Sequence, residues 1–142
     1  MGEARDPNRP ALGIQQPWVE LILRGIKTVE IRSQPTQIRG TIYLYASKRD
    51  STLECAAESI ARHELTPEKF GRGKIVGTVE LWNCRLATKK DAEAACVSSD
   101  LLTACHAWEL RHPKRFAEPL EVTFLPYGVW FYPWRRKNQG EA

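Results

Sequence analysis

The chain has 142 residues, a formal net charge of +4, 42% hydrophobic residues and 27% charged residues. Its length predicts one domain with a core of its own, and its composition excludes a disordered or fibrous chain. No apolar run reaches the roughly 20 residues that span a bilayer, and the first ten residues do not resemble a signal peptide. We expect a cytoplasmic protein that binds no membrane and has a weak preference for polyanionic partners.

The cysteine pattern argues against a metal centre. None of the four cysteines forms a C-x-x-C pair, and the spacing of Cys96, Cys105, His106 and His112 matches no zinc pattern. Unpaired cysteine usually behaves as a small buried hydrophobe. We therefore expect free thiols, no metal and no cofactor.

The first elements lie in an expected domain of residues 11–134, between a flexible leader (1–10) and a polar tail (135–142). An apolar run at 11–15 predicts a strand, and residues 17–24 predict a short helix. Pro17 suits the first helical position, and Trp18 shares an apolar face with the residues three and four further on. Gly25 suits the left-handed residue that ends such a helix.

A dense polar group follows this helix. The expected strand at 28–33 alternates, so Glu30 and Arg32 point to the opposite face from Val29 and Ile31. Lys27 immediately precedes it. A cation, a carboxylate and a guanidinium therefore meet within six residues. The alternative is a solvated strand face whose ion pairs contribute little.

The middle of the chain predicts two further strands with a helix between them. The strand at 41–48 places Tyr43 and Tyr45 on one face, either as a stacking platform or as an amphipathic cover. Residues 51–63 predict a helix with a capping box at Ser51 and Glu54. Residues 74–86 form the strongest predicted strand, in which Gly77 indicates a bulge or a close backbone approach.

The last third predicts shorter elements. We expect helices at 88–96 and 101–105, a basic loop at 111–115 and a brief strand at 120–122. Four aromatic residues near the end either close the sheet or dock a protein partner: Trp130, Phe131, Tyr132 and Trp134.

Three runs together resemble the ASCH domain family. They are Gln16-Pro17-Trp18, residues 25–32 and Arg39-Gly40, with weaker matches at 46–48, 70–79, 108–110 and 126–130. The resemblance implies an α+β fold, namely a PUA-like small β-barrel with flanking helices. It is closest to the stand-alone and transcription-coactivator types of ASCH domain, for which nucleic-acid binding is the implied role.

On this basis we expect RNA or a nucleotide to bind in a cleft at the Gly25–Arg32 motif, with the chain acting as a monomer. Cationic side chains would contact phosphate, and Trp18, Tyr43, Tyr45 or Trp108 would stack on bases. A buried core position is the favoured alternative for Trp18 and for Trp108. The candidate binding residues are Gln16, Trp18, Lys27, Glu30, Arg32, Arg39, Lys48 and Arg115.

Two alternatives stay open. The first is a hydrolase acting on a modified nucleoside such as acetylcytidine, or on RNA, with Lys27 and Glu30 as its catalytic residues. The family branch with that activity carries threonine where this chain has Glu30, and Glu80 is the only second acid that the strands offer. The binding module is therefore favoured. The second alternative is a protein-interaction module of a transcription or RNA-processing assembly.

Overall fold

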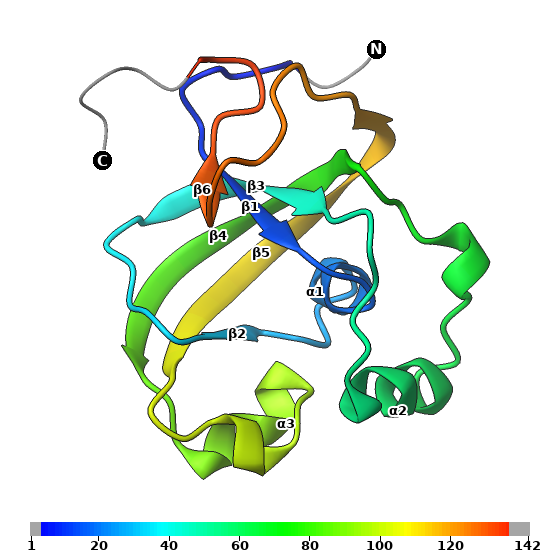
Figure 1. Ribbon diagram of the computed structural model, residues 1–142, viewed down its shortest axis with the longest axis vertical. Helices are drawn as coiled ribbons and strands as arrows, with labels where there is room; N and C mark the ends of the chain where they lie inside the picture. Colours follow the sequence, from blue (N-terminus) through cyan, green and yellow to red (C-terminus); the bar gives the residue numbers. More distant parts are fainter. Residues whose placement is uncertain (1–3, 137–142) are drawn as a thin grey trace.

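One mixed six-stranded sheet organises the computed structural model, which describes residues 4–136 (Figure 1). The strand order is β2-β5-β4-β3-β1-β6. Strands β1 and β3 are parallel, and the other neighbours are antiparallel. The strands are β1 (Ala11–Ile14), β2 (Val29–Arg32), β3 (Gly40–Ala46), β4 (Lys74–Leu86), β5 (His106–Leu120) and β6 (Trp130–Phe131).

The sheet curls into a half-barrel because its two long central strands are bent. The register of β4 against β5 shifts at three places, and such bulges bend a strand and increase its twist. The curl brings β2 back towards β1, although three strands separate them in the sheet. Arg32 on β2 donates from Nη2 to the carbonyl oxygen of Gly13 on β1 at 3.1 Å. The predicted α+β barrel with flanking helices is thus confirmed as a curled half-barrel with a few helices (Figure 1).

The helices are short and lie around the sheet. They are α1 (Trp18–Leu23), α2 (Glu54–Arg62) and α3 (Ala92–Ala95), with 3₁₀ turns η1 (Pro67–Lys69), η2 (Lys89–Asp91) and η3 (Ser99–Leu101). Helix α1 contacts β3, β4 and β5, and it buries Val19, Leu21 and Ile22 in the main core. No helix within residues 4–136 has the length and apolar character needed to cross a membrane.

A second core on the other side of the sheet is aromatic. Tyr43 is fully buried and Tyr45 is 4% exposed, and each packs edge-on against another ring of this core. The hypothesis of a tyrosine stacking platform is therefore wrong, because neither ring offers a free face. Phe131 is fully buried and Trp134 packs edge-on against Tyr43, so these two aromatic residues near the chain end pack in the second core.

Several local predictions change in the folded chain. The basic segment 111–115 belongs to β5 rather than to a loop. Beyond Glu109, β5 pairs only with β4, so Pro113 and Pro119 lie where one edge is open and a missing N–H is tolerated. The Ser51 capping box is also wrong, because α2 begins at Glu54 without a side-chain cap. The helix expected at 101–105 is also wrong, because the turn η3 ends at Leu101 and no helix follows it up to Cys105.

Other local predictions are confirmed. Gly25 has a φ of 75° and follows Arg24, the C-cap of α1. The helical segment expected at 88–96 begins with a capping box between Thr88 and Asp91. All four cysteines are free. Within the expected leader, Asp6 donates its backbone N–H to the Tyr43 hydroxyl at 2.8 Å. The remaining parts of the expected leader and tail, 1–3 and 137–142, lie outside the described residues.

Candidate functional site

A cavity of about 450 Å³ lies where β1, α1 and β2 meet the turn η3. Four of the eight predicted site residues line it: Trp18, Lys27, Glu30 and Arg32. The chain reverses just before it reaches the cavity, because the left-handed Gly25 lets the N–H groups of Ile26 and Lys27 both bond to the Leu21 carbonyl oxygen. This turn holds the backbone of Lys27 against the last turn of α1.

Lys27 is an internal cation. It is only 2% exposed, and its ammonium donates to the carbonyl oxygen of Ala95 at the end of α3. The ammonium lies 3.5 Å from Glu30 Oε1 and 5.1 Å from the centroid of the Trp18 ring. Burial lowers the pKa of Lys27, and the Glu30 carboxylate opposes that effect. The lysine therefore holds the local structure together, since its donors already face inward partners.

Glu30 is shared between two cations. Its carboxylate is 3.5 Å from Lys27 on one side and accepts a hydrogen bond from Arg32 Nε at 2.9 Å on the other. Arg32 keeps 24% of its side chain exposed, and its guanidinium lies 5.6 Å from the Trp108 ring centroid. The interpretation of this motif as a solvated strand face is wrong, because Lys27 and Glu30 are buried. We call Lys27, Glu30 and Arg32 the ion cluster; it carries one excess positive charge, most accessible at Arg32.

Two exposed leucines line the cavity, and the sequence patterns did not indicate them. Leu53, before α2, is 45% exposed and Leu101, in η3, is 39% exposed. We call this pair the leucine rim. No spacing signal could have found it, because the two residues are 48 positions apart and become neighbours of one cavity only through the fold. Gln15 rather than Gln16 belongs to the lining.

The other four predicted residues do not line the cavity. The Gln16 side chain is buried and donates to the Gly71 carbonyl oxygen at 3.0 Å. The Arg39 side chain bonds to backbone carbonyl groups of its own loop, and Lys48 lies against Gly73. Arg115 forms two hydrogen bonds to Glu20 on α1, at 3.0 and 2.8 Å.

Two further candidates also lie outside the cavity. Trp108 is 2% exposed, stacks on Trp130 at 5.6 Å and donates Nε1–H to the Gln34 carbonyl oxygen, so it is a core residue. Glu80 pairs with Arg111 at 3.0 Å on β5 and does not line the cavity.

The cavity thus offers one accessible guanidinium and an apolar rim. Trp18 also lines the cavity, but it is 7% exposed and packs in the main core, and the Lys27 ammonium lies over its ring.

Known protein structures share this fold. The solved structure of ASCH from Zymomonas mobilis superposes with a TM-score of 0.58 at 17% identity, over 93% of this chain and 90% of that one. A variant of the same protein gives 0.58 at 16% identity, over 91% of each chain. These matches confirm the fold.

The sequence is also similar to Activating signal cointegrator 1 of Homo sapiens and of Mus musculus, with 32% identity over 80 residues in each case. The match covers 51% of this chain but only 14% of those relatives, so the chain spans a small part of their length. The model of the ASCH domain matches residues 12–120, and the chain therefore belongs to the ASCH domain family.

Proposed function

We propose that this protein binds nucleic acid, RNA above all, by taking one unstacked nucleotide into the cavity at the Gly25–Arg32 motif. The observation that carries the proposal is the convergence of the ion cluster and the Trp18 side chain in one cavity of about 450 Å³. A volume in this range is typical of small-molecule pockets. Single-stranded RNA offers splayed bases whose faces and edges are free to enter such a site.

The leucine rim and the ion cluster have different roles in this proposal. A base enters between Leu53 and Leu101, where its faces replace water on apolar side chains that the fold leaves exposed. Its polar edge then meets Arg32, which is the most accessible charge of the ion cluster. Lys27 holds Glu30 from the buried side, so that the carboxylate and the guanidinium keep a fixed orientation before the guest arrives.

Phosphate contacts are expected outside the cavity. The exposed residue Lys48 belongs to the same connection between β3 and α2 that carries Leu53, and it can reach a phosphate next to the bound base. The net charge of +4 adds a weaker long-range attraction. This proposal predicts binding that weakens steeply as salt rises.

The test is fluorescence anisotropy with a pool of short single-stranded RNAs at low salt. Leu53→Glu and Leu101→Glu place a negative charge at the mouth of the cavity, at positions exposed enough to keep the fold. We expect each to weaken binding about tenfold, as a nearby like charge does. Leu125→Glu is the matched control, because Leu125 is 62% exposed and does not line the cavity. Equal binding by all three variants, or no salt-sensitive binding by the unmodified protein, overturns the proposal.

One observation favours a second candidate function, hydrolysis of a modified nucleoside. Lys27 is a buried amine with a lowered pKa beside a carboxylate in a cavity, and such groups are typical of catalytic sites. The test is acetate release from acetylcytidine, compared with the double variant Lys27→Met/Glu30→Gln. Release that the double variant abolishes supports the hydrolase, whereas no release at high protein concentration rejects it.

A further inference from the structure

The ion cluster offers the cavity a hydrogen-bond donor at one nitrogen of Arg32. Its Nε donates to Glu30 Oε2 at 2.9 Å, and its Nη2 lies 2.9 Å from the same oxygen and donates to the Gly13 carbonyl oxygen at 3.1 Å. Within residues 4–136 Nη1 has no hydrogen-bond partner, yet it is not among the buried side-chain atoms that lack one. Water therefore reaches Nη1, which carries two N–H groups and cannot accept a hydrogen bond.

This donor would meet a different group on each class of base. Uracil and guanine carry a carbonyl oxygen at the position where cytosine and adenine carry an amino group. A carbonyl oxygen accepts a hydrogen bond from Nη1, whereas an amino group sets a second donor against it. Resting on the RNA binding proposed above, we infer that Arg32, which lines the cavity, selects uracil and guanine over cytosine and adenine.

The guanidinium is held in one orientation before a guest arrives. Glu30 and Gly13 engage two of its nitrogens, and its central carbon lies 5.6 Å from the centroid of the Trp108 ring. Trp108 is itself fixed, because it is 2% exposed and stacked on Trp130. A guest cannot turn Arg32 away without breaking these contacts. Covering a charged donor without giving it an acceptor costs more than covering a neutral one, so the wrong base binds less tightly.

The other polar groups of the lining leave this selection to Arg32. Lys27 and Glu30 are only 2% and 7% exposed and face each other at 3.5 Å. Gln15 and Ser33 also line the cavity and are exposed. An amide and a hydroxyl can each donate or accept, so these two side chains adapt to either class of base. Arg32 therefore decides which class fits.

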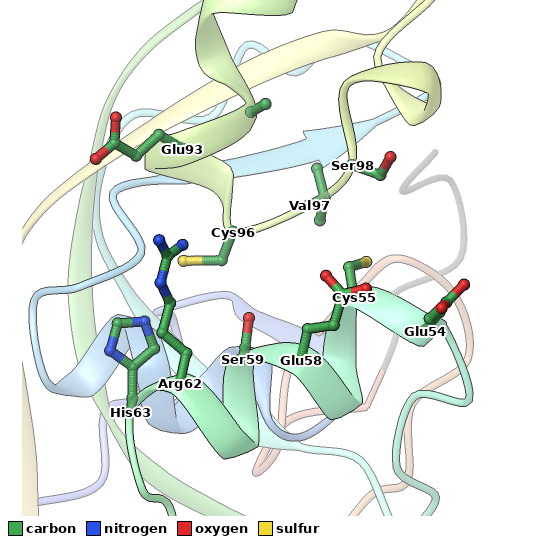
Figure 2. A pocket seen from close by; sticks show the side chains of 11 residues that line it. Glu54, Cys55, Glu58, Ser59, Arg62, His63, Glu93, Cys96, Val97 and Ser98 are labelled. Carbon is green, nitrogen blue, oxygen red and sulfur yellow. The ribbon is translucent and has the colours of Figure 1, made fainter.

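The larger cavity, of about 600 Å³ between α2 and α3, is lined by charged groups that are not held in this way (Figure 2). Glu54, Glu58 and Glu93 are exposed, and Figure 2 shows their carboxylates pointing away from one another. Arg62 also lines this cavity and is exposed. We therefore assign the selection of a base to the smaller cavity, where the guanidinium is fixed.

The test is fluorescence anisotropy at low salt and neutral pH with decauridylate and decacytidylate, two RNAs of like size that differ in the group facing Nη1. We expect the unmodified protein to bind decauridylate about tenfold more tightly, as hydrogen bonds to charged groups allow. Arg32→Gln puts an amide that can also accept in place of the fixed donor, so the two affinities should come within about twofold of each other.

Arg111→Gln is the matched control for this variant. Arg111 also pairs with a glutamate and lies over a tryptophan ring, at 5.0 Å from the centroid of Trp82, but it does not line the cavity. Its replacement removes the same charge and should leave the preference for decauridylate unchanged. Thermal melts check that both variants keep the fold, and the comparison of the two RNAs on the unmodified protein needs no variant.

The outcomes separate this inference from the proposed function. If the two decamers bind equally and Leu53→Glu weakens both, the selection is wrong and the proposed function stands. The selection is also wrong if decacytidylate binds more tightly, if the RNA pool binds and decauridylate does not, or if the preference survives Arg32→Gln. If neither the decamers nor the RNA pool binds, both the selection and the proposed function are wrong.

Discussion

Replacing Glu30 by glutamine tests the electrostatics of the ion cluster directly. The change leaves the buried Lys27 ammonium, 2% exposed, with the Ala95 carbonyl oxygen and the Trp18 ring as its partners. Removing one member of a buried ion pair costs about 3–5 kcal/mol. The Lys27–Glu30 separation of 3.5 Å is long for such a pair, and the two remaining partners still stabilise the ammonium. We therefore expect a loss of about 3 kcal/mol in the free energy of unfolding at neutral pH.

This loss should shrink as the pH rises. Burial holds the pKa of Lys27 in the folded protein below its ordinary value of 10.5. Between the folded-state pKa and the ordinary pKa, the unfolded chain binds more protons than the folded protein, so stability rises with pH. Glu30 raises the pKa of Lys27. Without that carboxylate the pKa falls further, and the variant begins to gain stability at a lower pH than the unmodified protein. The difference between the two should be smallest near pH 10.5.

The assay is urea unfolding followed by tryptophan fluorescence at neutral and alkaline pH. Lys27→Met is the first comparison; it leaves Glu30 paired with Arg32 and should cost about 1–2 kcal/mol. The double variant should lie within about 1 kcal/mol of the unmodified protein, because it leaves no unpaired buried charge. If the double variant loses the sum of the two single losses, or if Glu30→Gln is neutral, the account of the ion cluster is refuted.

Three further predictions concern the frame around the site. Gly77→Ala should destabilise the protein by about 2–3 kcal/mol in a urea titration, because its Cβ would lie 2.2 Å from the Lys114 carbonyl oxygen; Gly13→Ala, whose nearest contact is 3.8 Å, should cost less than about 1 kcal/mol. Burial disfavours the Glu20 carboxylate, yet its two arginine partners lower its pKa from 4.5. As the pH falls below 4.5, the unmodified protein should therefore lose more stability than the Glu20→Gln variant. Asp91→Ala should lower the melting temperature and cost about 1–2 kcal/mol, because Asp91 completes the capping box that Thr88 begins at η2 and accepts two hydrogen bonds from Arg85; an unchanged melt contradicts this.

Most of the regular structure could be predicted from local patterns. The strand expected at 74–86 is observed as β4 with the same bounds, Lys74–Leu86, because alternation and β-branched residues act within the strand itself. The bulge at Gly77 and the helix stop at Gly25 are also confirmed. The 111–115 segment was predicted wrongly because the effect of Pro113 depends on whether a neighbouring strand needs its missing N–H.

The candidate site could be predicted only in part, for a related reason. The sequence by itself determined that Lys27, Glu30 and Arg32 would lie together, because they are close along the chain and follow a left-handed glycine. Only the tertiary structure decided which cations remain accessible. Lys27 is bonded to a carbonyl group 68 residues away and Arg115 to a carboxylate 95 residues away. Burial and pairing depend on neighbours in space, and spacing along the chain does not report partners at such separations.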